Sequence, residues 1–79
     1  MTNLEKYNKV FTEIFAVSEE VLNANFGHSQ ADNWDSVRHL NLVSAIEENF
    51  DIMLDTEDIL GFISYEAGKE ILKKYGIIF

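Results

Sequence analysis

Apolar residues recur every three or four positions in four stretches of the chain, which is the spacing of one face of an α-helix. The first stretch predicts a helix over residues 4–22, with Thr2 or Asn3 as its N-cap and Glu5 in its first turn. Small and polar residues then predict a loop over residues 23–33.

The second stretch predicts a helix that begins at Asp35 or Ser36. Its apolar stripe is expected to face the core and consists of Val37, Leu40, Val43, Ile46 and Phe50, with Leu42 off its centre. The C-terminal end of this helix is acidic, although negative charge there opposes the helix dipole. The acidic end is therefore a weak indication of a functional surface.

A short third helix follows an extended connection over residues 51–54, in which two hydrophobic side chains are expected to point inward. Asp55 or Thr56 is its expected cap, and Asp55 and Asp58 have the spacing of a capping box. Its apolar residues are Ile59, Leu60, Phe62 and Ile63.

Ser64 is the expected cap of a last helix over residues 65–75, and Gly76 lies where such a helix ends. Its core positions are Ala67, Ile71 and Leu72. The apolar tail of residues 77–79 either folds back onto the helices or forms an exposed contact, and the sequence leaves both possibilities open.

These elements predict an all-α fold in a single domain of residues 1–79, with three longer helices and one short third helix. Phe11, Phe15, Phe50 and Phe62 fall on apolar stripes and are expected in the core. Phe26 is expected to pack there from the loop.

Charge and composition narrow the function. The chain has 14 acidic and 6 basic residues and a net charge of −8, so nucleic acid is an unfavourable partner and basic protein surfaces are favoured ones. Residues 28–67 hold nine acids and a single base, Arg38. No apolar run is long enough to span a membrane and no secretory signal is evident, so we expect a cytoplasmic monomer that does not bind membranes.

Ser36 has the most defined setting of any candidate for chemistry, because it opens a helix where N–H groups and the helix dipole favour an anion. His39 lies one turn later, which raises a serine–histidine hydrolase as one reading. That reading also needs an orienting group and an oxyanion hole, for which so short a chain has little room, so we expect no enzyme. His39 is then a solvent-facing helix residue.

Two other features of the sequence could belong to a site: a tryptophan just before the second helix and a group of carboxylates after it. Trp34 either staples the helix start near Arg38 and Leu40 or lies exposed beside Ser36. The carboxylates between Asp51 and Asp58 do not fit a calcium loop, because that pattern needs an oxygen ligand at the third position and glycine at the sixth. No metal site is predicted.

A long run of residues at the second helix resembles the acyl carrier protein family, whose hallmark is Asp-Ser-Leu at the head of that helix. The matching residues here are Trp34-Asp35-Ser36-Val37-Arg38-His39-Leu40-Asn41-Leu42-Val43 and then Ala45-Ile46-Glu47-Glu48-Asn49-Phe50-Asp51-Ile52. Chain length, acidity and helix order extend the resemblance over nearly the whole chain. It implies a four-helix bundle of acyl-carrier type.

The resemblance implies that Ser36, next to Asp35, carries 4′-phosphopantetheine. A phosphopantetheinyl transferase would move that group from coenzyme A with magnesium, and the thiol of the arm would carry acyl groups as thioesters. This would explain a chain without cysteine. The second helix would bind acyl-loading and acyl-transferring enzymes with basic surfaces through Val37, Arg38, Leu40, Asn41, Ser44, Glu47 and Glu48.

Departures from the family pattern indicate a specialised carrier. Val37 replaces leucine, Arg38 replaces an acid, Asn41 and Ser44 replace an acid and an apolar contact, and Asp55 replaces a frequent proline. Such a carrier would serve secondary metabolism, surface-polysaccharide modification, or fatty-acid or polyketide synthesis. The alternatives are an aminoacyl or peptidyl carrier and an unmodified carrier-like interaction module.

Family members often bury acyl chains between the second and third helices. Ile59 and Phe62 are bulky candidates for that space, beside Ile46. We therefore expect poor burial of long acyl chains.

Overall fold

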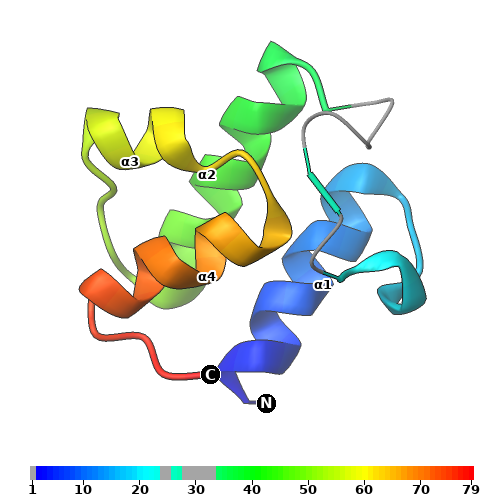
Figure 1. Ribbon diagram of the computed structural model, residues 1–79, viewed down its shortest axis with the longest axis horizontal. Helices are drawn as coiled ribbons and strands as arrows, with labels where there is room; N and C mark the ends of the chain where they lie inside the picture. The colour runs from blue at the N-terminus through cyan, green and yellow to red at the C-terminus, as the bar shows by residue number, and fades with distance from the viewer. Residues whose placement is uncertain (1, 24–25, 28–33) are drawn as a thin grey trace.

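A computed structural model describes residues 2–23, 26–27 and 34–79. These parts of the chain contain the helices α1 (Asn3–Phe15), α2 (Ser36–Phe50), α3 (Thr56–Gly61) and α4 (Tyr65–Lys74), with a 3-10 turn, η1 (Glu19–Val21). α1 packs against α2, and α3 packs against α4. In Figure 1, α4 crosses in front of α2. The all-α prediction is therefore confirmed for the described residues, although the predicted loop at 28–33 lies outside them.

The start of α1 is as predicted, but its end is not. Thr2 and Glu5 form a reciprocal capping box. The helix stops at Phe15, well before the predicted end, and Ala16 takes the left-handed conformation with φ 54°. A continuing helix would offer the Ile14 carbonyl to a later N–H of its own chain, but the Arg38 guanidinium takes that carbonyl instead. The Ala16 and Val17 N–H groups both bond back to the Thr12 carbonyl and close the helix, and the Arg38 contact satisfies a carbonyl that this end leaves free.

Aromatic rings fill the core around Phe11, which is fully buried. Its ring centroid lies 4.8 Å from that of Tyr7, 6.1 Å from Trp34 and 5.4 Å from Tyr65. Phe15, Phe26 and Phe62 complete the ring cluster at 5.7, 6.0 and 6.3 Å. Such tilted and edge-on pairs add to the free energy of burial. The prediction that Phe26 packs into the core is confirmed.

Gly68 lets α4 approach this cluster. A Cβ at that position would lie 2.2 Å from the Tyr7 hydroxyl and 2.4 Å from the Phe62 ring. The Tyr7 hydroxyl donates a 2.6 Å hydrogen bond to the Tyr65 carbonyl, and burial raises the pKa of this phenol. Close helix approach therefore depends on the missing side chain of Gly68.

The apolar stripe predicted for α2 is only partly correct. Val43, Ile46 and Phe50 are buried, and so is Leu42, which the prediction placed off the centre of the stripe. Val37 and Leu40 are instead exposed. Trp34 supplies the apolar surface beside the first turn of α2, so these two side chains are not needed in the core.

α3 begins after Asp55, but the predicted capping box does not form, because the Asp55 side chain makes no cap hydrogen bond. The Asp58 carboxylate is buried and accepts hydrogen bonds from Lys74 Nζ at 2.6 Å and from the Tyr75 hydroxyl at 2.5 Å. These two donors hold the pKa of Asp58 below its ordinary value. Asp58 thus joins α3 to the end of α4.

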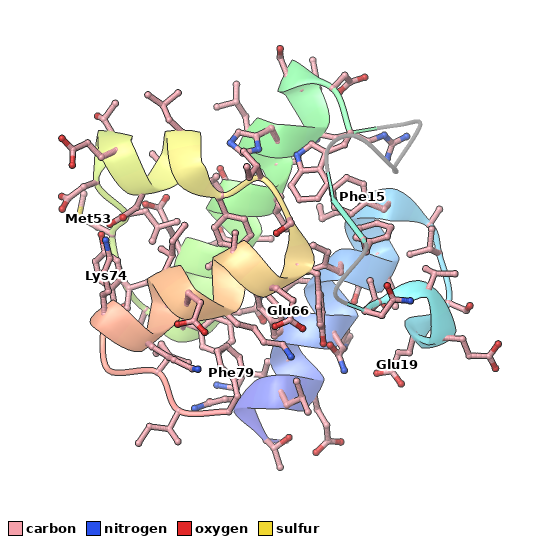
Figure 2. The ribbon with its side chains drawn as sticks, in the orientation of Figure 1. Phe15, Glu19, Met53, Glu66, Lys74 and Phe79 are labelled. Atoms are coloured by element: carbon pink, nitrogen blue, oxygen red, sulfur yellow. The ribbon has the colours of Figure 1, made fainter. Side chains whose placement is uncertain are left out.

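The C-terminal end of the chain folds back, which settles the open alternative for its tail. Ser64 caps α4 through the Ala67 N–H, and Gly76 closes it with φ 85°, both as predicted. Asn3 Nδ2 donates to the Ile78 carbonyl at 2.9 Å, and the Phe79 ring lies 5.2 Å from Tyr7. The two ends of the chain are consequently side by side, and Phe79 lies beneath α4 (Figures 1 and 2).

The Asp58 contacts predict a defined loss of stability in acid. A lowered folded-state pKa stabilises the fold above the unfolded value of about 4, and this stabilisation disappears as pH falls through the folded value. Asp58→Asn should therefore lower the melting temperature at neutral pH, and its deficit against the natural chain should shrink below about pH 4. Thermal melts followed by circular dichroism across this range measure the effect. Glu57→Gln, an exposed acid on the same helix, is the control and should leave the acid limb unchanged.

Candidate functional site

Ser36 occupies the first position of α2 and is exposed. Asp35 is the N-cap, and its side chain accepts a 2.9 Å hydrogen bond from the Arg38 N–H, as an N-cap residue should. The cap fixes the first turn and leaves the Ser36 hydroxyl outside it. The positive end of the helix dipole lies at this point, so a negatively charged group joined to Ser36 would be stabilised there.

Three side chains hold this first turn from its inner side. Trp34 is buried and packs 4.8 Å from the Phe15 ring, so the alternative that it lies exposed beside Ser36 is wrong. Its ring also stacks on His39 at 6.2 Å, so it contacts the helix start as a staple does, with His39 between the expected neighbours Arg38 and Leu40. Arg38 extends to α1, where its guanidinium donates to the Ile14 carbonyl. Trp34 Nε1 donates a 3.0 Å hydrogen bond to His39 Nδ1.

His39 is half-buried rather than solvent-facing, and both of its ring nitrogens are engaged. Because the indole N–H can only donate, Nδ1 must be the acceptor. Nε2 lies 2.7 Å from the Ile59 carbonyl, which can only accept, so Nε2 carries the hydrogen. This geometry gives Ser36 no free imidazole nitrogen as a base, and so it does not support the serine–histidine reading.

An apolar cleft of about 400 Å³ opens directly beside Ser36, between α2 and α3. Asp35, Ser36, His39 and Leu40 line one wall, and Ile59, Leu60, Phe62 and Ile63 line the other. Leu40, Leu60 and Ile63 are 61%, 72% and 56% exposed, whereas Phe62 is fully buried and closes the cleft toward the core. A group attached to Ser36 would therefore start on an apolar surface.

The residues predicted to bind partners divide into two groups. Val37, Leu40, Asn41, Ser44 and Glu48 are exposed along α2, whereas the Glu47 carboxylate accepts a 2.9 Å hydrogen bond from the Leu54 N–H and Arg38 is tied to α1. The side chains of Arg38 and Glu47 thus serve the fold. The exposed group forms one continuous outer face of α2, which we call the outer face.

The acidic surface offers charge but no built metal site. Asp35 at the cleft and Glu48 on the outer face are exposed, as are Asp55 and Glu57 at the start of α3. Within the described residues, no group of three or more potential metal ligands comes together. No helix in the same residues is long and apolar enough to cross a membrane.

The resemblance named Ile59 and Phe62 for the space between the second and third helices, and both line the cleft, but the rest of this wall was missed. Leu60 and Ile63 were named only as apolar residues of the third helix and not as part of a site, and the contact of His39 with α3 was not foreseen. Leu60 lies near the end of α3 and Ile63 just beyond it, and two apolar residues at such a helix end are a weak signal of an exposed wall. The bond from His39 to a backbone carbonyl has no sequence signature.

No protein-family model matches the chain, and no curated protein matches its sequence at a significant level.

Because Arg38 bonds to α1, we expect its side chain to stabilise the fold, which an exposed side chain of α2 would not do. Arg38→Met keeps an apolar stem but removes the donor to the Ile14 carbonyl, and it should lower the free energy of unfolding by roughly 1–3 kcal/mol. Urea denaturation measures this loss. Asn41→Ala, at an exposed position of the same helix, should change the value by less than about 0.5 kcal/mol. Equal effects of the two substitutions would show that Arg38 does not hold α1 and α2 together.

Proposed function

We propose that this chain is an acyl carrier protein of acyl-carrier-type helical fold, which carries acyl groups as thioesters on a 4′-phosphopantetheine arm attached to Ser36. The observation that carries the proposal is the position of Ser36, which is exposed at the first residue of α2 and at the edge of an apolar cleft. The sequence around this serine resembles that family.

Local physics supports an attached phosphodiester at this position. Its negative charge would lie at the start of α2, where the helix dipole contributes about 0.3–1 kcal/mol of stabilisation. The base that deprotonates the Ser36 hydroxyl would come from the transferase, so the engagement of both His39 nitrogens is no obstacle. Leu40, Leu60 and Ile63 would support the apolar portions of the arm.

The chain's composition fits the same role. It has no cysteine, so the thiol for thioester chemistry would come from the arm. Partner enzymes would approach the outer face of α2, whose exposed apolar side chains are Val37 and Leu40. Exposed acids nearby would favour partners with basic surfaces and speed their encounter.

A second candidate is an unmodified module that binds another protein through the same surface. The exposed apolar residues Val37, Leu40, Leu60 and Ile63 favour it, because such side chains mark interaction surfaces when they gather together. An aminoacyl or peptidyl carrier is the same proposal with a different cargo. Modification of Ser36 separates the carriers from the module.

The test is intact-mass analysis after incubation with a broad-specificity phosphopantetheinyl transferase, coenzyme A and magnesium. We expect the mass to rise by one phosphopantetheine group, because the exposed serine is accessible to the transferase. Ser36→Ala should abolish the increase. Ser44→Ala, which removes another exposed serine from the same helix, should leave it intact.

Two results would count against the carrier proposal. An unchanged mass with transferases of several specificities would favour the unmodified module. An increase that persists in Ser36→Ala would place the modification on a different residue.

A further inference from the structure

The Trp34–His39–Ile59 hydrogen bonds lie at the base of the Ser36 cleft and join its two walls. His39 stands on α2 and Ile59 on α3, and both residues line the cleft. The bonds measure 3.0 Å from Trp34 Nε1 to His39 Nδ1 and 2.7 Å from His39 Nε2 to the Ile59 carbonyl. We call this chain of bonds the indole–imidazole link.

α3 is also tied at its other end. Asp58 bonds to Lys74 and Tyr75, and the Tyr75 hydroxyl accepts a 3.1 Å hydrogen bond from the Asp55 N–H. A helix of only six residues is thus held to α4 near its start and to α2 near its end. If α3 moved away from α2, His39 Nε2 and the Ile59 carbonyl would lose the bond that they share, which is costly for groups away from water.

Phe62 closes the space beneath the link. It is fully buried, and its ring stacks on Phe11 at 6.3 Å and lies 6.4 Å from Tyr7. Packing of this density leaves no path for an alkyl chain unless a ring or a helix moves. Leu40, Leu60 and Ile63 meanwhile offer an apolar surface outside the core.

We propose that His39 determines cargo specificity by closing the passage between α2 and α3, so that an acyl group attached through Ser36 lies in the surface cleft and not in the core. This inference rests on the proposed function. The cleft has exposed walls at Leu40, Leu60 and Ile63, so a long acyl chain that lies in it leaves more apolar surface in water than a short one does. The cargo class that fits is therefore short-chain or polar-ended acyl groups, presented directly to partner enzymes.

A tether that needs no transferase tests the passage independently of the proposed function. Because the natural chain has no cysteine, Ser36→Cys introduces a unique thiol at the cleft. Butyl or dodecyl methanethiosulfonate converts this thiol to a mixed disulfide, with methanesulfinate as the leaving group, and so attaches a short or a long chain there. Methyl NMR signals of Leu40, Leu60 and Ile63 report on the cleft, and those of Leu42, Ile46 and Leu72 report on the fully buried core.

With His39 in place, both tethers should shift the cleft methyl signals, and neither should shift the core signals. In His39→Leu the link is lost, and the dodecyl tether should shift the core signals while the butyl tether does not. His39→Gln keeps an amide donor for the Ile59 carbonyl and should behave as the parent. Asn41→Ala is the control on the exposed side of α2 and should also behave as the parent.

Three results would overturn the inference. The dodecyl tether could shift the core signals while His39 is present, His39→Leu could leave the dodecyl pattern unchanged, or His39→Gln could admit the long chain as His39→Leu does. If His39→Leu does not fold, the comparison of the two tethers in the parent and in His39→Gln still decides. A parent that excludes both tethers from the core but gains no mass with transferases would contradict the carrier function and leave the closed passage supported.

Discussion

The fixed first turn of α2 is the constraint on which the rest of this structure depends. Trp34 anchors it in the aromatic core, Arg38 bonds it to the end of α1, and His39 bonds it to α3. All three side chains extend inward from a turn that the Asp35 cap has already oriented. One turn of helix thereby positions three elements of the fold and leaves its opposite side exposed.

The exposed side of that turn is where function is proposed. Ser36 can be presented at a helix start because neighbouring residues, and not Ser36 itself, hold the helix in place. Arg38 is an example of such a neighbour. It is the single base among residues 28–67, and its guanidinium bonds to the Ile14 carbonyl within the fold. The outer face of α2 therefore combines the apolar side chains of Val37 and Leu40 with polar side chains and the acid Glu48. Such a face would suit a partner surface that is basic and has an apolar centre.

Local signals made much of the helix pattern predictable, whereas contacts distant in sequence decided the rest. Thr2, Asp35 and Ser64 cap helices because their side chains reach N–H groups three residues later, and such spacing is visible in a sequence. The bond of Arg38 to the end of α1 and the contact of Gly68 with Tyr7 join distant parts of the chain, so neither could be inferred from sequence neighbours. Spacing likewise placed Ser36 at a helix start, and the family resemblance named Ile59 and Phe62 for the opposite wall, but neither showed that Leu60 and Ile63 are exposed there.

A crystal structure of the chain after treatment with a phosphopantetheinyl transferase and coenzyme A tests the central claim most directly. That claim is that inward bonds fix the first turn of α2 and leave Ser36 as the attachment point. We expect a phosphodiester on Ser36 Oγ, with the indole–imidazole link and the Arg38 bond to Ile14 intact. An unmodified Ser36, or an attached arm that enters the core with His39 turned to solvent, would contradict it.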